Sequence, residues 1–154
     1  ILSRQNMPVL DRKDLAPAAL VEQGGYVLWQ SGGAPQLILI GTGSELQLAL
    51  EAGRKLAAEG VAVRVVSMPS CEIFDRQSQQ LKDSVLPPAC TCRVAVEAGS
   101  SMGWARYVGS QGRTVSIDHY GASAPYQVLA EKFGFTVANV VRVAREALAG
   151  GSPS

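Results

Sequence analysis

The feature that most constrains the fold is a buried strand, a helix and a second strand in direct succession. Residues 36–41 are almost uniformly apolar, which predicts an interior strand covered on both faces. A helical pattern follows at residues 44–60, and residues 61–67 predict another strand directly after it. Two strands joined through a helix run parallel, with a right-handed crossover. The sequence therefore predicts the α/β class.

The predicted helix at residues 44–60 carries signals at both ends and in its middle. Ser44 with Gln47 three residues later predicts a capping box, and Gly60 predicts the C-terminal stop. Gly53 lies in mid-helix, where glycine costs about 1 kcal/mol relative to alanine. A glycine at this position predicts close packing of that turn against the sheet.

The remaining elements fit around this unit and complete one domain. Further strands are predicted at residues 25–30, 93–97 and 114–118. Helices are predicted at residues 17–23, 75–83, 124–133 and 137–148, with a short amphipathic turn at 104–108. A chain of 154 residues is long enough for one core and too short for two.

Composition excludes several functional classes. The formal charge is +1, so the chain lacks the basic excess of a nucleic-acid-binding protein. No apolar stretch approaches the roughly 20 residues that a membrane span needs, which predicts a soluble chain. Charged residues make up 18% of the sequence, below the typical value of about 25%, which indicates that other protein covers part of the surface.

The cysteines indicate a reducing compartment, most simply the cytoplasm. Cys71, Cys90 and Cys92 are odd in number and cannot all pair within one chain. Cys90 and Cys92 resemble half of a metal site, but His119 is the only histidine and no second pair of ligands completes it. We therefore expect buried or half-buried thiols and no metal site.

The turn at residues 41–45 is a candidate anion site. Thr42, Gly43 and Ser44 lie between a strand and a helix N-terminus, where free amides and the helix dipole favour an anion. However, the turn lacks the third glycine of a dinucleotide fingerprint and the lysine of a P-loop, and Glu45 adds a negative charge. A structural turn with a serine cap is the favoured interpretation.

Other candidate residues follow the predicted strands. Glu97 ends one strand as either a catalytic carboxylate or a capping acceptor, and we favour the structural role. His119 is a potential general base, but Asp118 is badly placed to orient it, which favours a surface or interface histidine. Trp104 and Tyr107 could stack on a ligand, pack in the core or form a subunit interface, and we favour the interface. No catalytic residue is assigned.

Six segments together resemble transketolase, and the resemblance extends over nearly the whole chain. They are residues 2–8, 24–28, 42–45, 65–70, 94–99 and 121–125. The sequences Ser-Arg-Gln-Asn at 3–6 and Gly-Ala-Ser-Ala-Pro at 121–125 favour transketolase over the pyruvate dehydrogenase β subunit or deoxyxylulose-phosphate synthase.

The resemblance implies a fold and a parent reaction. It implies a three-layer α/β/α domain whose five-stranded mixed sheet is mostly parallel, with strand 1 antiparallel. The parent enzyme would move a two-carbon ketol unit between sugar phosphates, using thiamine diphosphate and a divalent cation (Mg²⁺ or Ca²⁺) at a homodimer interface. The chain has no Gly-Asp-Gly segment of the kind that holds this cofactor, so we expect no cofactor to be bound by this chain alone.

The resemblance also implies domain boundaries and one site residue. Residues 1–12 would be the end of the preceding pyrimidine-binding domain and a linker, 13–149 the transketolase C-terminal domain, and 150–154 a flexible tail. Residues 1–3 resemble the end of a strand with no initiator methionine, so we expect a fragment. Arg4 matches the family arginine that contacts the sugar phosphate, with an interdomain ion pair as the alternative.

Two functional hypotheses follow. The leading one is a non-catalytic domain that stabilises the parent dimer, whose partners are the N-terminal and middle domains, the second subunit and the sugar phosphate. The alternative is an independent small-molecule or anion-binding regulatory module that uses the turn at residues 41–45. A self-contained enzyme is disfavoured because the sequence assembles no nucleophile and base.

Overall fold

A five-stranded sheet in the order β1-β3-β2-β4-β5 organises the computed structural model, which describes residues 7–150. The strands are β1 (Tyr26–Gln30), β2 (Leu37–Gly41), β3 (Val63–Ser67), β4 (Arg93–Val96) and β5 (Arg113–Val115). β1 is antiparallel to β3 and the other pairs are parallel, which confirms the expected mixed sheet. β5 ends before the predicted residue 118, because its neighbour β4 ends at Val96, opposite Val115.

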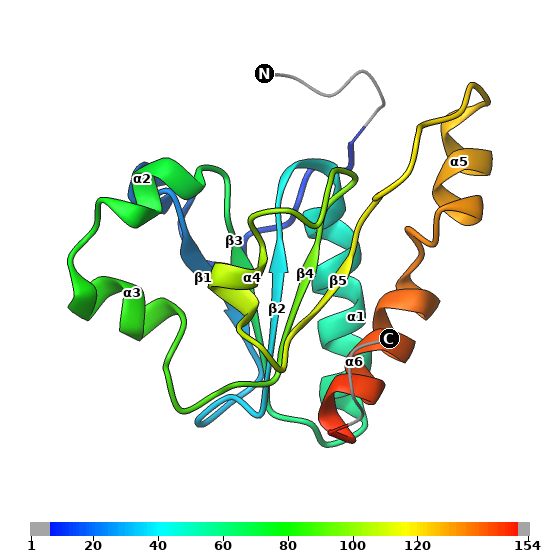
Figure 1. Cartoon of the computed structure of the whole chain (residues 1–154). Coiled ribbons are helices and arrows are strands. Elements are labelled where there is room, and N and C mark those ends of the chain that lie inside the picture. Colours follow the sequence, from blue (N-terminus) through cyan, green and yellow to red (C-terminus); the bar gives the residue numbers. More distant parts are fainter. Residues whose placement is uncertain (1–6, 151–154) are drawn as a thin grey trace.

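Helices cover both faces of the sheet, which gives the three layers (Figure 1). One face carries α1 (Leu46–Ala58) and α6 (Val137–Leu148), and the other carries α2 (Cys71–Asp75), α3 (Gln79–Val85) and α4 (Ala105–Val108). The 3₁₀ helix η1 (Ala18–Gln23) precedes β1, η2 (Gly43–Glu45) precedes α1, and α5 (Tyr126–Lys132) precedes α6. The predicted helix at 137–148 is confirmed, and the predicted helix at 17–23 is a 3₁₀ helix.

Alternate residues of β2 belong to different cores. Leu37 and Leu39 pack with α1 and α6, whereas Ile38 and Ile40 face α2 and α4, and all four are fully buried. This follows from the two-residue period of a strand. The predicted interior strand is therefore confirmed.

The single helix predicted at residues 75–83 is wrong. Two helices stand in its place, since α2 ends at Asp75 and α3 begins at Gln79. The Ser78 hydroxyl accepts a hydrogen bond from the Leu81 amide at 3.3 Å and caps α3, as Ser70 caps α2. A serine cap requires a non-helical backbone at its own position, so the chain cannot continue one helix through Ser78.

The capping box predicted at Ser44 is also wrong. α1 begins at Leu46, and the Ser44 hydroxyl donates to Oε1 of Glu45 at 2.5 Å instead of capping the helix. The Oε2 of Glu45 accepts a hydrogen bond from the Ala98 amide at 3.3 Å. This long-range contact holds Glu45 inside the fold. Residues Gly43–Glu45 form the short 3₁₀ helix η2 directly before α1.

The close packing predicted at Gly53 is confirmed. A Cβ added to Gly53 would lie 2.7 Å from Cγ2 of Val65 on β3. The helix therefore approaches the sheet at a distance that no larger residue permits. Gly41, at the end of β2, is equally confined, because an added Cβ would lie 2.7 Å from the Cα of Leu46.

We predict that Gly41→Ala lowers the free energy of unfolding by about 1–3 kcal/mol, because the obstructing atom belongs to the backbone and cannot rotate away. Gly121→Ala is the matched control, since nothing lies within 4 Å of an added Cβ there, and it should change stability by less than about 0.5 kcal/mol. Urea denaturation measures both values. Equal stability of the two variants would contradict the packing described.

Candidate functional site

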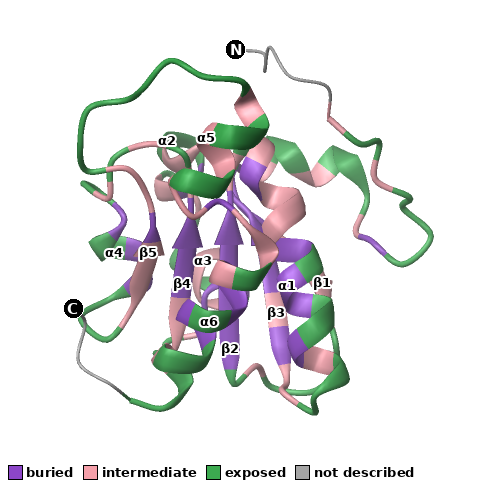
Figure 2. Ribbon diagram, turned by 90° about the vertical axis from the view of Figure 1, so that its right-hand side faces the viewer, coloured by how far each residue is buried: buried purple, intermediate pink, exposed green. Residues whose placement is uncertain are grey.

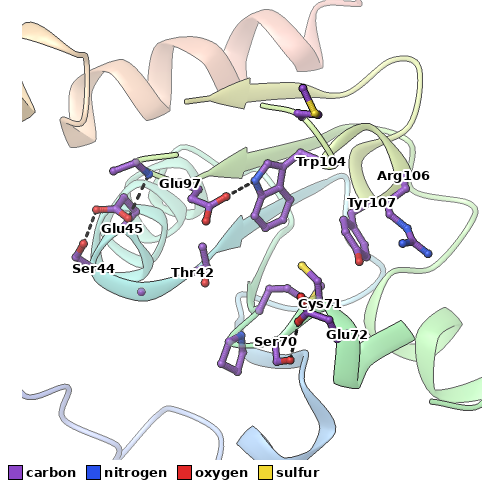
Figure 3. Close-up of a pocket in the computed structure, with 16 residues that line it drawn as sticks. Thr42, Ser44, Glu45, Ser70, Cys71, Glu72, Glu97, Trp104, Arg106 and Tyr107 are labelled. Carbon is purple, nitrogen blue, oxygen red and sulfur yellow. Dashed lines mark hydrogen bonds between the residues drawn. The ribbon is translucent and has the colours of Figure 1, made fainter. Parts of the chain in front are cut away.

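A crevice of about 820 Å³ lies where the carboxyl ends of β2, β3 and β4 meet (Figure 3). Its walls are the segments after these strands, at residues 42–45, 68–72 and 97–107. The chain passes from β2 to β3 on one side and then returns to β4 on the other side of β2. In open α/β sheets, ligands bind at such a switch point, so this crevice is the candidate site.

The crevice has an acidic lining. Glu45, Glu72 and Glu97 contribute carboxylates, whereas Arg106 is the cation among its lining residues and pairs with Asp75 at 2.9 Å. The pKa of Glu72 lies below its usual value, first because its own backbone N–H donates to the carboxylate and then because the Ser70 hydroxyl does. This surface attracts cations and repels phosphate.

The structure places the predicted anion-binding residues Thr42, Gly43 and Ser44 on the wall of this acidic crevice (Figure 3). Gly43 has a positive φ of 54°, a conformation that favours glycine. Glu45, buried directly beside them, supplies the opposing charge that the sequence indicated. This geometry supports the structural interpretation of the turn.

Trp104 and Tyr107 lie in the core, so the preference for a subunit interface is wrong for both. They are 5% and 6% exposed, and their rings meet edge to face at a centroid distance of 5.7 Å. The indole Nε1 of Trp104 donates to Glu97 at 2.5 Å (Figure 3). The Tyr107 hydroxyl donates to Asp75 at 3.0 Å. Aromatic side chains with a polar group can be buried when that group finds such a partner.

Glu97 has the structural role that the sequence favoured. Its carboxylate anchors Trp104 across the loop that follows β4, and it packs against Gly99, where an added Cβ would lie 3.3 Å from Cδ of Glu97. Within residues 7–150, no second carboxylate shares a hydrogen bond with Glu97. The arrangement fixes the loop rather than forming an acid–base pair.

His119 and Asp118 do not form a catalytic pair. Asp118 accepts hydrogen bonds from the Ser101 amide at 2.8 Å and the Ser100 hydroxyl at 3.1 Å. The Ser101 backbone N–H is the main reason that the pKa of Asp118 lies below its usual value. The exposed His119 ring instead contacts Phe133 edge to face at 5.0 Å. The prediction of a surface histidine is confirmed.

The thiols are buried or half-buried, as predicted. Burial raises the pKa of all three, and the nearby Cys90 adds to the effect at Cys92, whose pKa rises to about 11. Reactive cysteines need a lowered pKa, so these thiols are poor nucleophiles. Within residues 7–150, no group of histidine, cysteine, aspartate and glutamate side chains could hold a metal ion.

Sequence reasoning missed the third wall of the crevice. Cys71 and Glu72 on α2, together with Asp75 beside Tyr107, come from the segment after β3. The signal was present, because this segment directly follows a parallel strand whose carboxyl end lies at the switch point. Arg4 and residues 151–154 lie outside the described residues, so the structure does not test the phosphate contact or the flexible tail.

Comparison with known proteins identifies the family. The family model described as "Transketolase-like TK C-terminal domain" matches residues 24–136. The chain is 53% identical over 144 residues to a transketolase of Streptococcus pyogenes and 52% identical over 148 residues to transketolase 1 of Escherichia coli. It belongs to the transketolase family. These alignments cover 93% and 96% of the chain but only 20% and 22% of the relatives, so it spans about a fifth of their length.

Solved structures agree with this assignment. A transketolase from Leishmania mexicana matches 88% of the chain at 39% identity with a TM-score of 0.77, over 20% of its own length. A Pichia stipitis transketolase in complex with sedoheptulose 7-phosphate matches 95% of the chain at 32% identity with a TM-score of 0.81, over 20% of its own length. The transketolase C-terminal domain fold is therefore established for this chain.

We predict that Trp104→Phe lowers the free energy of unfolding by about 1.5–3 kcal/mol, the usual range for a hydrogen bond to a charged group. A double-mutant cycle with Glu97→Ala, whose side chain cannot accept the hydrogen bond, followed by denaturant unfolding, isolates the interaction between the two side chains. Tyr120→Phe, at an exposed aromatic residue, serves as the control for aromatic substitution. Strictly additive effects of the two substitutions would argue against the bond.

Proposed function

We propose that this chain is the C-terminal domain of a transketolase that transfers two-carbon ketol units between sugar phosphates. The supporting observation is that relatives named transketolase align over nearly all of this chain and are about five times as long. The domain's role is structural: it stabilises the parent dimer and its contacts with the N-terminal and middle domains. The parent would use thiamine diphosphate and a divalent cation.

The chain alone is proposed to lack catalytic activity. Its crevice does not fit the cofactor, because Glu45, Glu72 and Glu97 would face the negative diphosphate and no described group of side chains could hold the cation. A related solved chain, 26% identical with a TM-score of 0.71, is described as a "Split gene transketolase, inactive beta4 tetramer". This chain covers 48% of that one, and its inactivity is consistent with the proposal.

The alternative, an independent anion-binding module at residues 41–45, has less physical support. Anion binding there would have to overcome the buried Glu45 and the carboxylates across the crevice. For location, we propose the cytoplasm, where thiols such as the three free cysteines stay reduced. Among residues 7–150, no helix combines the length and apolar character needed to cross a membrane.

The test compares the purified 154-residue chain with the full-length protein that carries it, each with thiamine diphosphate and Mg²⁺. We expect ketol transfer from xylulose 5-phosphate to ribose 5-phosphate by the full-length protein and none by the 154-residue chain, because the cofactor site lies outside it. A coupled assay for glyceraldehyde 3-phosphate measures both. Transfer by the short chain alone would overturn the proposal, as would an inactive full-length protein that is folded and cofactor-loaded.

Arg4 is proposed to contact the phosphate of the sugar substrate. The proposal rests on its position in the Ser-Arg-Gln-Asn segment, and on the planar guanidinium, which donates two parallel hydrogen bonds to phosphate oxygens and stays charged at any working pH. An ion pair between domains is the competing role. Loss of a phosphate contact would lower kcat/KM only for phosphorylated substrates, whereas loss of an ion pair between domains would lower it for all substrates.

In the full-length enzyme, we predict that Arg4→Ala weakens phosphorylated donors by about 1.5–3 kcal/mol, so that kcat/KM falls roughly tenfold to a hundredfold. An unphosphorylated donor such as erythrulose should keep its kcat/KM, because it has no phosphate to lose. Lys13→Ala, which removes an exposed cation from the same part of the chain, is the control. An equal loss for both donors would indicate the interdomain ion pair instead.

A further inference from the structure

The exposed apolar side chains of this domain gather at one end. Among residues 7–150, the three most exposed large apolar or aromatic residues are Tyr120, Val9 and Met102, at 99%, 98% and 89%. Met102 and Tyr120 follow β4 and β5, so they lie at the carboxyl end of the sheet. The chain also enters at this end with the segment that contains Val9 (Figure 1). By contrast, Leu148 at the opposite end is 37% exposed.

A projecting segment dominates this end of the molecule. Residues 118–125, here called the arm, are all exposed and arch from β5 to α5, which itself has no buried residue (Figure 2). The arm contains Gly121, Ala122, Ala124 and Pro125 around the exposed Tyr120, and its one carboxylate is Asp118. Tyr120 follows the exposed His119 and precedes small residues, and exposed tyrosines are enriched at protein interfaces.

The arm and the Met102 loop form one surface, because hydrogen bonds tie their bases together. Asp118 accepts from the Ser101 amide at 2.8 Å, and the Ile117 amide donates to the Gly99 carbonyl at 2.7 Å. The position of Met102 is thus linked to that of Tyr120. We call this surface, made of Met102 and the arm, the carboxyl-end surface.

We propose that the carboxyl-end surface docks onto the remaining polypeptide of the same molecule, the domains that precede this one in the full-length enzyme. This inference rests on the proposed function. About four-fifths of the sequence of the matched relatives lies outside the part that this chain covers. The described part of the chain begins at the same end of the molecule as the arm (Figure 1), so preceding polypeptide would join the domain at this end. With Asp118 already hydrogen-bonded, the arm offers a partner the exposed ring of Tyr120 and the small residues after it, together with the imidazole of His119 and the hydroxyl of Ser123.

Hydrogen–deuterium exchange of the full-length protein and of the 154-residue chain tests this proposal. We expect amides of residues 118–126 to exchange at least about tenfold more slowly in the full-length protein, because docking covers them. Residues 31–35, an exposed turn at the opposite end of the sheet, should exchange at the same rate in both. Equal exchange of the arm in the two proteins would overturn the proposal.

Substitutions provide a second, independent test. Met102→Asp with Tyr120→Asp places charges on the surface, whereas Ala34→Asp places one on the distant exposed turn. The double variant should remove the arm's protection in the full-length protein, and Ala34→Asp should not. Neither should change the thermal midpoint of the 154-residue chain, because all three side chains are exposed there. Undiminished protection in the double variant would contradict docking at these residues.

The outcomes separate this inference from the proposed function. If the slow exchange of the arm disappears when the full-length protein is diluted to single subunits, a second copy of the protein covers the surface. That result would overturn the proposal that the preceding domains of the same molecule cover it. A protected arm in a protein without ketol transfer would refute the proposed function and leave the docking intact. Active full-length protein with an unprotected arm would refute the docking alone.

Discussion

The burial of β2 on both faces is the constraint on which the rest of the structure depends. Residues 37–40 are fully buried, at 0% exposure. Their side chains alternate between the two faces of the sheet, and each face contributes to a separate core. One layer of helices could cover only half of these side chains, so the chain must return helices to both sides. Because β2 also bonds to β3 and β4, its carboxyl end becomes the point where the two loops diverge and the crevice forms.

Where sequence analysis succeeded, local pattern and tertiary packing favoured the same structure. The apolar run of β2 and the amphipathic helix α6 lie where their periodicity predicts, and Gly53 packs against Val65 as its position in mid-helix indicated. Prediction failed where a polar side chain had two possible partners. Ser78 caps a new helix rather than lying within one, and Ser44 bonds to Glu45 because Glu45 is fixed by Ala98, a residue 53 positions away.

The candidate site was predictable in its position but not in its internal contacts. Glu97 and Trp104 could be placed near a strand end by counting residues, and the segment after β3 could have been placed by the same rule. The 2.5 Å hydrogen bond between Trp104 and Glu97 depends on how the loop between these two residues turns back, and no periodicity in the sequence specifies that turn. The same uncertainty explains the mistaken interface assignment: Trp104 and Tyr107 look like contact residues in sequence until Glu97 and Asp75 supply internal partners for their polar groups.

These internal partners also bear on how the end of the domain can be covered by protein. A polar group that loses water without gaining a partner costs about 1–3 kcal/mol, and a charged one costs more. Here Trp104 is already paired with Glu97, Tyr107 with Asp75, and Asp118 with Ser101. Covering Met102 and Tyr120 therefore removes water chiefly from apolar and aromatic surface, which is favourable, while these paired groups keep their hydrogen bonds. A satisfied polar framework beneath exposed apolar side chains suits a rigid docking platform better than a reaction centre, which needs polar groups free to engage a substrate.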